Sequence, residues 1–188
     1  MARWKPNAAE RLAQAALDLF SERGYENTTV IDIAQRAGLG KTTFFRHFQD
    51  KREVLFGGGS IDELLMDAIA TAPATASPLE AVTCALDIAG REIYTSARRE
   101  FVIRRQAVIA ANAELAEREA LKTERLGRAM VDALTRRGVP ELTARVAAQL
   151  GTVASAIAYE RWSRTTDGDF SVIARQVVAE VEASVLWR

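Results

Sequence analysis

The sequence has only one cysteine and one histidine among its 188 residues. The single cysteine, Cys84, excludes an internal disulfide framework and fits a reducing compartment. The single histidine, His47, leaves too little material for a histidine metal cluster or a catalytic pair or triad that contains histidine. A glycine-rich phosphate loop is also missing. We therefore expect no cofactor, no metal and no enzymatic activity, although an all-helical enzyme remains the alternative from another class.

Long apolar runs and strand signals are scarce as well. No run approaches the roughly 20 apolar residues that a membrane span requires, and the first residues, MARWKPNAAER, lack the apolar core of a signal peptide. The chain has four prolines and no Asn-Gly or Asp-Gly turn between alternating strand patterns. Apolar residues make up 48% and charged residues 27%, as in ordinary globular proteins. These features predict a cytoplasmic protein of the all-α class.

Net charge gives little guidance, because 25 basic residues balance 25 acidic ones. Residues 1–56 hold 9 Lys/Arg against 7 Asp/Glu, and residues 57–188 hold 16 against 18. This asymmetry has the sign that a nucleic-acid partner requires, but it is small. Electrostatics alone would not indicate such a partner.

The most informative stretch is residues 28–48, TTVIDIAQRAGLGKTTFFRHF. Thr29 can cap a first helix, with Asp32 three residues later completing a capping box. Gly38-Leu39-Gly40 then interrupts the pattern, since glycine tolerates the positive backbone angles that end a helix. The pattern predicts a short helix followed by a tight turn.

A second helix is expected from Lys41. Phe44 and Phe48 are four residues apart and face the core together, which turns the intervening side chains elsewhere. Those side chains are Thr42, Thr43, Phe45 and Arg46. Two short helices joined at a glycine turn form a helix-turn-helix, whose second helix usually reads the DNA major groove.

Helical periodicity and caps account for the rest of the chain. Further helices are expected over about residues 7–23, 51–69, 79–95, 97–111, 112–137, 141–164 and 169–187. Gly57-Gly58-Gly59 falls inside the second of these, where each glycine costs about 1 kcal/mol relative to alanine. Either that helix breaks and restarts at Ser60, or the glycines form a joint. We take them as a domain boundary, between residues 1–56 and 57–188.

The first 56 residues resemble the DNA-binding domain of the TetR family of bacterial transcriptional regulators. The resemblance rests on ALDLFSERGYENTTV, DIAQRAGL, KTTFFRHF and DKREVL, in that order and at the family's spacing. The remainder is similar only in helix count and length. The resemblance implies an all-α chain of about nine helices, with a C-terminal domain for ligand binding and dimerisation.

The resemblance also implies a homodimer that binds a palindromic operator in double-stranded DNA and leaves it when a small molecule binds. A regulator without a small-molecule inducer, controlled by a partner or acting as an activator, is the alternative. Phosphate contacts are expected from Thr29, Thr43, His47 and Lys51, and the recognition face from Lys41, Thr42, Phe45 and Arg46. For Arg46 an intramolecular ion pair is an equal alternative, and for His47 the alternative is packing.

Two positions depart from the family pattern. Gly40 stands where many members have a Ser or Thr that caps the recognition helix, so a hydroxyl is missing there. Phe45 stands where Tyr is common, so a hydrogen bond from a phenol to phosphate is lost. An exposed phenylalanine can instead touch a thymine methyl group in the major groove.

Two further sites are expected in the C-terminal part. Residues 146–158 carry no charge, and small residues among them would permit close helix approach. We therefore expect a four-helix dimer interface rather than an interior helix or bare surface. Its residues would be Val146, Leu150, Val153, Ile157, Ile173, Val177 and Val181. A ligand pocket could be lined by Tyr94, Phe101, Arg105, Tyr159 and Trp162, which could equally be core and surface residues.

Overall fold

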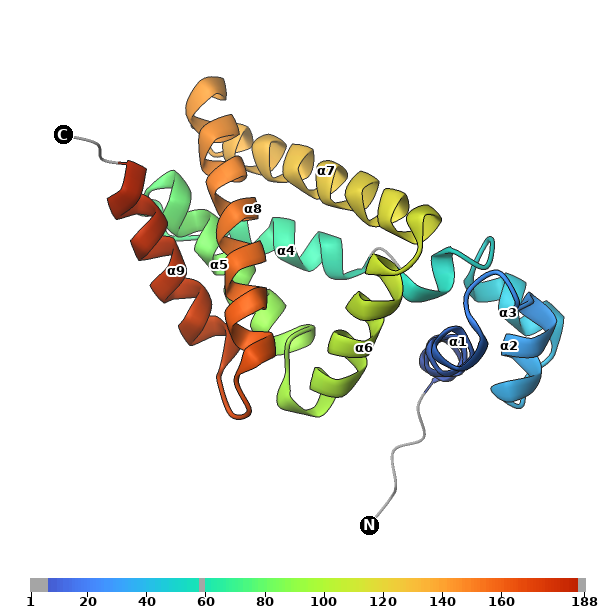
Figure 1. Ribbon diagram of the computed structural model, residues 1–188. Coiled ribbons are helices and arrows are strands. Elements are labelled where there is room, and N and C mark those ends of the chain that lie inside the picture. The colour runs from blue at the N-terminus through green and yellow to red at the C-terminus, as the bar shows by residue number, and fades with distance from the viewer. Residues whose placement is uncertain (1–6, 58–59, 186–188) are drawn as a thin grey trace, which may run out of the picture. The chain divides into compact units, whose positions relative to one another are not determined.

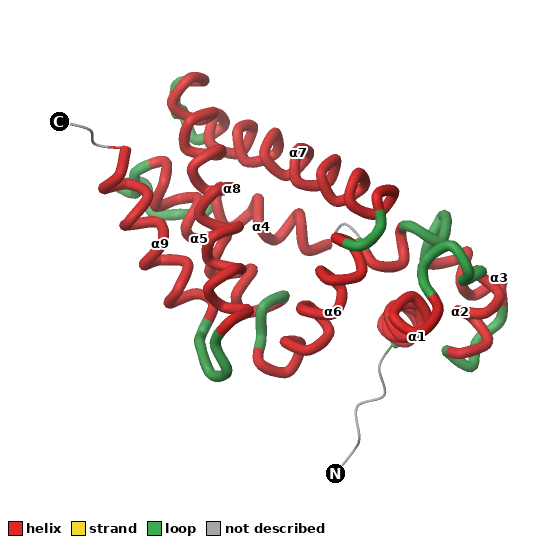
Figure 2. The backbone as a smooth tube through the Cα atoms, in the orientation of Figure 1, coloured by secondary structure: helices red, strands yellow, loops and turns green. Residues whose placement is uncertain are grey.

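The protein is all-helical in a computed structural model that describes residues 7–57 and 60–185. Over these residues the chain forms nine α-helices and two 3-10 turns, and no strand (Figures 1 and 2). The helices are α1 (Ala8–Arg23), α2 (Val30–Arg36), α3 (Lys41–His47), α4 (Ser60–Ala70), α5 (Pro78–Glu92), α6 (Arg99–Ala110), α7 (Ala113–Arg136), α8 (Glu141–Arg164) and α9 (Phe170–Val185). The 3-10 turns are η1 (Glu53–Leu55) and η2 (Ser96–Arg98). None of the described helices is long and apolar enough to cross a membrane.

Local capping chemistry sets where several helices begin. Asn7, Thr29 and Ser77 each accept a hydrogen bond from the backbone N–H three residues later, and the acidic side chain at that position bonds back. Each capping box satisfies two backbone N–H groups that have no partner inside the helix. The predicted starts of α1, α2 and α5 are confirmed to within one or two residues.

The prediction of a helix that begins near residue 51 is wrong for its first part. Asp50 does cap the chain, accepting the backbone N–H of Arg52 and Glu53 at 2.8 and 3.1 Å. Only the turn η1 follows, however, and Gly57 at φ +70° lies outside helical space. The next helix, α4, begins at Ser60. Gly58, Gly59 and the expected last residue of the final helix, Trp187, lie outside the described residues.

The chain folds as two compact units. The first consists of residues 1–58 and 100–120, and the second of residues 59–99 and 121–188. The division into functional domains at residue 57 stays a prediction. The first compact unit differs from the predicted domain by residues 100–120, which comprise nearly all of α6 and the first two turns of α7.

The first unit has a continuous apolar core. Its fully buried side chains come from α1, α2, α3, η1, α6 and α7, and include Leu12, Leu17, Ile33, Phe44, Val54, Ile109 and Leu115. Burying a large apolar side chain stabilises a fold by about 1.5–3 kcal/mol. Residues of α6 and α7 are therefore part of what holds the three N-terminal helices together.

The second unit packs α5, α8 and α9 against one another, and α4 against α5 (Figure 1). Small residues allow these helices to approach closely. A Cβ atom added at Gly151 of α8 would lie 2.3 Å from Cγ1 of Val82 in α5. One added at Gly90 of α5 would lie 2.2 Å from Oγ of Ser171 in α9. Cys84 is half-buried beside the core of this unit.

Candidate nucleic-acid interface

The turn between α2 and α3 is fixed by backbone geometry and by α1. Gly38 adopts φ +65°, a left-handed conformation that favours glycine. The Arg11 guanidinium donates a hydrogen bond to the Ala37 carbonyl at the end of α2. Arg36 pairs with Glu22 of α1 at 2.7 Å. These contacts set the angle at which α3 leaves the turn.

The start of α2 is held by Thr29. Its hydroxyl accepts the Asp32 N–H at 3.2 Å and donates to the Asp32 carboxylate at 2.6 Å. Hydrogen bonds from Thr29 are the main reason that the pKa of Asp32 is lowered, and the nearby Arg23 adds to the effect. The Thr29 hydroxyl is thus a helix cap as well as a predicted phosphate contact.

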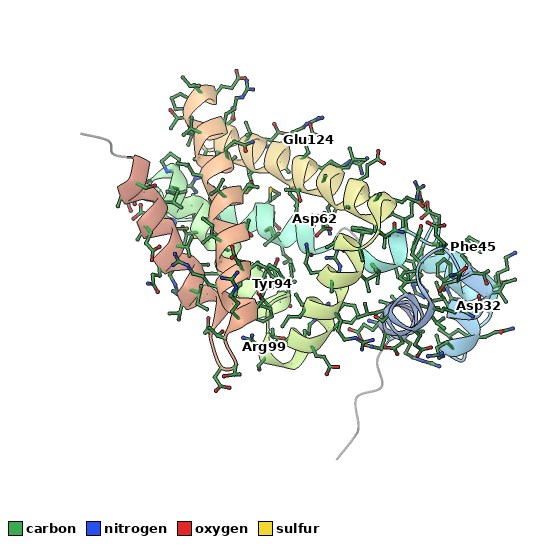
Figure 3. All side chains as sticks on the ribbon, in the orientation of Figure 1. Asp32, Phe45, Asp62, Tyr94, Arg99 and Glu124 are labelled. Carbon is green, nitrogen blue, oxygen red and sulfur yellow. The ribbon has the colours of Figure 1, made fainter. Side chains whose placement is uncertain are left out.

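The recognition helix turns its aromatic residues in two directions. Phe44 and Phe48 are 0% and 7% exposed and pack in the core, as their spacing indicates. Phe45 is 48% exposed and points away from the core (Figure 3). The Lys41 ammonium lies 5.8 Å from the centre of the Phe45 ring. The other predicted contacts on the helix, Thr42, Arg46 and His47, are exposed, and Thr43 is half-buried.

Gly40 occupies the N-cap position of α3. It has φ −88° and ψ 157° and makes no side-chain capping bond. A Cβ atom added there would meet nothing within 4 Å. The site therefore has room for a serine or threonine side chain, and the glycine is not required by packing.

The two alternatives for Arg46 can be compared with the structure. Its guanidinium is exposed and forms no ion pair or hydrogen bond with any residue that the structure describes. The intramolecular ion pair therefore lacks a partner in the described part of the chain. Among the residues that the structure describes, His47 makes only a tilted ring contact with Phe48, at 6.3 Å between ring centres.

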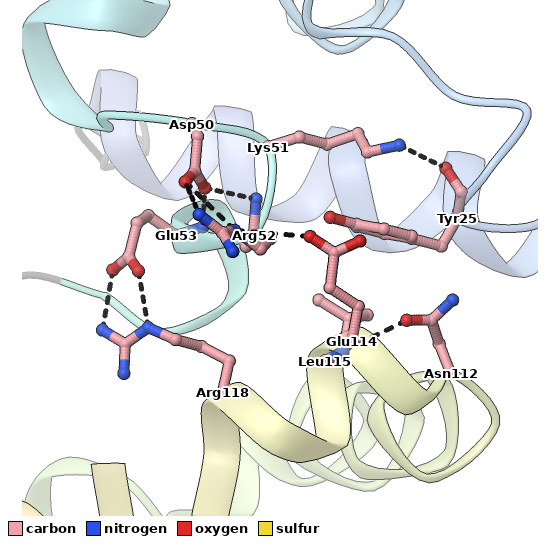
Figure 4. A network of polar contacts seen from close by, with 9 residues as sticks. All are labelled: Tyr25, Asp50, Lys51, Arg52, Glu53, Asn112, Glu114, Leu115 and Arg118. Carbon is pink, nitrogen blue, oxygen red and sulfur yellow. Dashed lines mark hydrogen bonds and ion pairs between the residues drawn. The ribbon is translucent and has the colours of Figure 1, made fainter. Parts of the chain in front are cut away.

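Lys51 lies after α3 and is half-buried. Its ammonium donates a hydrogen bond to the Tyr25 carbonyl at 2.8 Å and lies 3.8 Å from the centre of the Tyr25 ring (Figure 4). Such a cation–π contact fixes the position of an otherwise flexible ammonium group. Tyr25 was not singled out in the sequence, because its partner is 26 residues away.

Charge on this unit is nearly balanced. Residues 1–58 and 100–120 together carry 12 Lys/Arg and 11 Asp/Glu. Bulk attraction of this unit to a polyanion is therefore weak. In the described part of the chain no three His, Cys, Asp or Glu side chains group as metal ligands.

Comparison with known proteins identifies this surface. The sequence model described as "Bacterial regulatory proteins, tetR family" matches residues 12–57, which contain α2, the turn and α3. Residues 12–57 are therefore a TetR-family segment. The HTH-type transcriptional regulator TcmR of Streptomyces glaucescens is 43% identical over 75 residues, which make up 39% of this chain and 33% of that protein. The chain thus matches about a third of that relative's length.

Solved structures extend the likeness in fold to nearly the whole chain. A TetR-family repressor of Thermus thermophilus, FadR in complex with lauroyl-CoA, has a TM-score of 0.55 at 20% identity and covers 96% of each chain. NalD of Pseudomonas aeruginosa, the secondary repressor of the MexAB-OprM multidrug efflux pump, has a TM-score of 0.60 at 17% identity and covers 94% of this chain and 95% of that one. The chain therefore has the all-helical fold of these proteins over nearly its whole length.

The predicted pocket residues separate into two groups. Tyr94, Tyr159 and Trp162 form an aromatic cluster with Phe170, whose ring stacks on Tyr94 at 4.1 Å. Arg99 lies 4.1 Å from the Trp162 ring centre and donates to the Trp162 carbonyl at 2.6 Å, and Figure 3 shows it at the same end of α8 as Tyr94.

Phe101 and Arg105 belong to the first compact unit, whereas the cluster lies in the second. Phe101 packs against the core of that unit, and Arg105 donates to the Leu55 carbonyl and pairs with Glu119 at 3.0 Å. Each has a structural partner of its own. Sequence spacing missed Phe170, the first residue of α9, and Arg99, the first residue of α6, because both reach the cluster through contacts between distant segments.

The predicted dimer stripe is divided between surface and core. On α8, Val146 and Val153 are 47% and 48% exposed, and Leu150 and Ile157 are half-buried. On α9, Ile173 is half-buried, whereas Val177 and Val181 are buried inside the protomer. Val177 and Val181 therefore fill the core of their own unit and present little surface to a second subunit.

Proposed function

We propose that this TetR-family regulator is a homodimeric repressor that binds a palindromic operator and is released from it by a small-molecule ligand. The observation that carries the proposal is the exposed face of α3, on which polar, basic and aromatic side chains surround a helix that is otherwise anchored by Phe44. Two such helices, one from each subunit, would enter successive major grooves about 34–36 Å apart. The protein would act in the cytoplasm.

Within this proposal Thr43 and Lys51 contact phosphates, and Phe45 reads a base. Phe45 has no hydroxyl to bind phosphate, but its exposed ring can pack on a thymine methyl group. The neighbouring Lys41 ammonium contacts the same ring and brings a positive charge toward the DNA. Phosphate contacts position the protein, whereas base contacts give sequence preference.

Substitutions at Lys51 and Phe45 are expected to have different effects. Lys51→Ala should weaken binding to all duplexes alike and reduce the slope of log affinity against log salt by about 1. Phe45→Ala should leave that slope unchanged and cost about 1–3 kcal/mol on the preferred sequence only. The measurement is fluorescence anisotropy with a duplex selected by the wild-type protein from a random pool, and with a scrambled duplex. A selection that yields no preferred sequence contradicts the proposal.

The second unit offers a surface for the dimer. Leu142, Val146 and Val153 lie on one face of α8 and are 76%, 47% and 48% exposed. Val172 of α9 is 59% exposed. A family member that binds a palindrome needs an isologous interface, in which each subunit presents the same surface to the other. Exposed branched apolar residues at helical spacing suit such an interface.

Charge placed on this surface should separate the subunits. Val153→Glu is expected to weaken dimerisation about 100-fold or more, because an unpaired carboxylate would be buried at the interface. Thr143→Glu is the matched control, since Thr143 is exposed on α8 about 100° away from Leu142 around the helix. Light scattering after size-exclusion chromatography measures the subunit number. A monomeric wild-type protein, or equal effects of the two variants, would count against this interface.

Ligand release rests on the fold of the second unit. A repressor with the same fold was crystallised with lauroyl-CoA, so this helical architecture can hold a small molecule. A ligand that binds better to the form without DNA must, by linkage, weaken DNA binding by the same factor. Compounds that raise the melting temperature should therefore be tested for release of the selected duplex, and a stabilising compound that leaves DNA affinity unchanged would not be an inducer.

A further inference from the structure

The position of the Lys51 side chain depends on residues outside its own segment of the chain. Beneath its ammonium lies the ring of Tyr25, which is 6% exposed and packs edge-on against Phe20 at 5.1 Å between ring centres. The Tyr25 phenol faces the Glu114 carboxylate, in the first turn of α7 (Figure 4). Burial of the phenol, and then the charge of Glu114, raise the pKa of Tyr25. The phenol therefore stays protonated beside the carboxylate.

Glu114 also contacts the residue that follows Lys51. Its carboxylate lies 3.4 Å from Nε of Arg52, whose guanidinium also donates to Asp50, from Nη2 at 2.7 Å and from Nε at 3.1 Å. Burial of Asp50 opposes its ionisation, but hydrogen bonds from Arg52 and from backbone N–H groups outweigh burial and lower its pKa. One carboxylate on α7 thus faces both the ring under Lys51 and the side chain next to Lys51.

The position of Glu114 is itself well fixed. Asn112 accepts the Leu115 N–H at 3.1 Å, and the Leu115 side chain is fully buried. One turn later Arg118 binds Glu53 through two hydrogen bonds, of 2.6 and 3.0 Å. Arg118 and Arg105 both lie against the Phe56 ring, at 5.2 and 5.1 Å. The first turn of α7 is therefore docked firmly on the segment that carries Lys51.

We propose that Glu114 is a positioning residue for DNA binding, which directs the Lys51 ammonium by holding the Tyr25 ring and the Arg52 side chain. The inference rests on the proposed phosphate contact of Lys51. Glu114 does not touch DNA, and as a negative charge it repels the backbone. The helix α7 itself runs on without a break into residues of the second compact unit.

The direction in which Glu114→Gln changes the affinity for DNA distinguishes a positioning role from charge repulsion alone. Glu114→Gln removes a negative charge, which by itself should tighten binding to a polyanion. Positioning predicts the opposite, a loss of about 3- to 5-fold, which is the size of one partly exposed charge contact. Glu117→Gln is the matched control, since Glu117 is an exposed residue on the same helix with the same charge change. It should leave affinity equal or slightly higher.

The experiment is anisotropy with the duplex selected from a random pool, for each variant in the wild-type and Lys51→Ala backgrounds. Glu114→Gln should weaken binding only where Lys51 is present, and Tyr25→Phe should behave in the same way, because it keeps the ring and removes the phenol. Unfolding midpoints of all variants should match the wild type. The inference is overturned if Glu114→Gln behaves like Glu117→Gln, or if it costs the same with and without Lys51.

If Lys51 does not contact phosphate, the same experiment gives a different pattern of affinities. If Lys51→Ala alone changes neither affinity nor salt slope, Lys51 is not a phosphate contact and the positioning role falls with it. Thr43→Ala then decides whether the proposed DNA-binding face stands, because Thr43 is on α3 and makes no contact with Tyr25 or Glu114 in the described part of the chain. If Thr43→Ala lowers the affinity, the proposed DNA-binding face of α3 stands, and only the contribution of Lys51 is rejected.

Discussion

Gly151→Ala is expected to destabilise the protein by about 1–3 kcal/mol, although alanine is the better helix former. A Cβ atom at this position would lie 2.3 Å from Cγ1 of Val82, which is 0% exposed. Val82 is β-branched and lies inside a helix, where it has essentially one χ1 rotamer and cannot turn aside. The free-energy cost of overpacking this contact between two helices is larger than the stabilisation from the higher helix propensity of alanine.

The same substitution elsewhere provides the control. Gly127 lies inside α7, and a Cβ atom there would meet nothing within 4 Å, so Gly127→Ala should stabilise by about 0.5–1 kcal/mol. Urea unfolding measures whether each variant raises or lowers the free energy of unfolding. Adding Val82→Ala to Gly151→Ala should cost less than the sum of the single changes, because the collision disappears. Stabilisation by Gly151→Ala would contradict the close approach of α5 and α8.

Leu115→Ala is expected to destabilise the first unit by about 2–5 kcal/mol, the usual cost of emptying a fully buried leucine site. Leu115 belongs to α7 but is 0% exposed in the same core as Phe44 and Val54. DNA binding should therefore fall in a variant whose substitution lies 67 residues after Phe48 in the chain. A loss of this size removes much of the marginal stability of a small unit.

Leu121→Ala is the matched control, because Leu121 lies on the same helix and is 45% exposed. Its cost should be no more than about 0.5 kcal/mol. Hydrogen exchange locates the effect: Leu115→Ala should accelerate exchange in α1 and α3 and leave α8 unchanged. Equal destabilisation by the two substitutions, or faster exchange confined to α7, would mean that α7 does not support the helix-turn-helix.

Much of the fold follows from local sequence. Asn7, Thr29 and Ser77 mark helix starts because a capping box involves only four consecutive residues. Burial of Phe44 and exposure of Phe45 follow from helical periodicity in the same way. The exposed face of α3 could therefore be predicted residue by residue.

Other features depend on contacts between distant segments. Asp50 caps a turn rather than a helix, since Val54, Leu55 and Phe56 are all buried in succession, which no exposed helix would allow. The ion pair between Glu53 and Arg118 joins residues 65 apart in the chain, and no local pattern indicates it. For α9, an apolar stripe looks the same whether it faces its own core or another subunit, so the sequence could not separate Val177 from Val172.

The chain leaves the first compact unit after residue 58 and returns to it for residues 100–120. This has a practical consequence for the design of chimeric regulators. A recombinant hybrid joined at residue 57 would carry α1 to α3 and η1 but would take its α6 and α7 from the donor of the second domain. Phe56 would then lose Arg105 and Arg118, and the buried sites of Ile109 and Leu115 would be filled by unrelated side chains. A graft that is to keep its operator preference should transplant residues 100–120 together with the first 57, as a discontinuous module with three junctions.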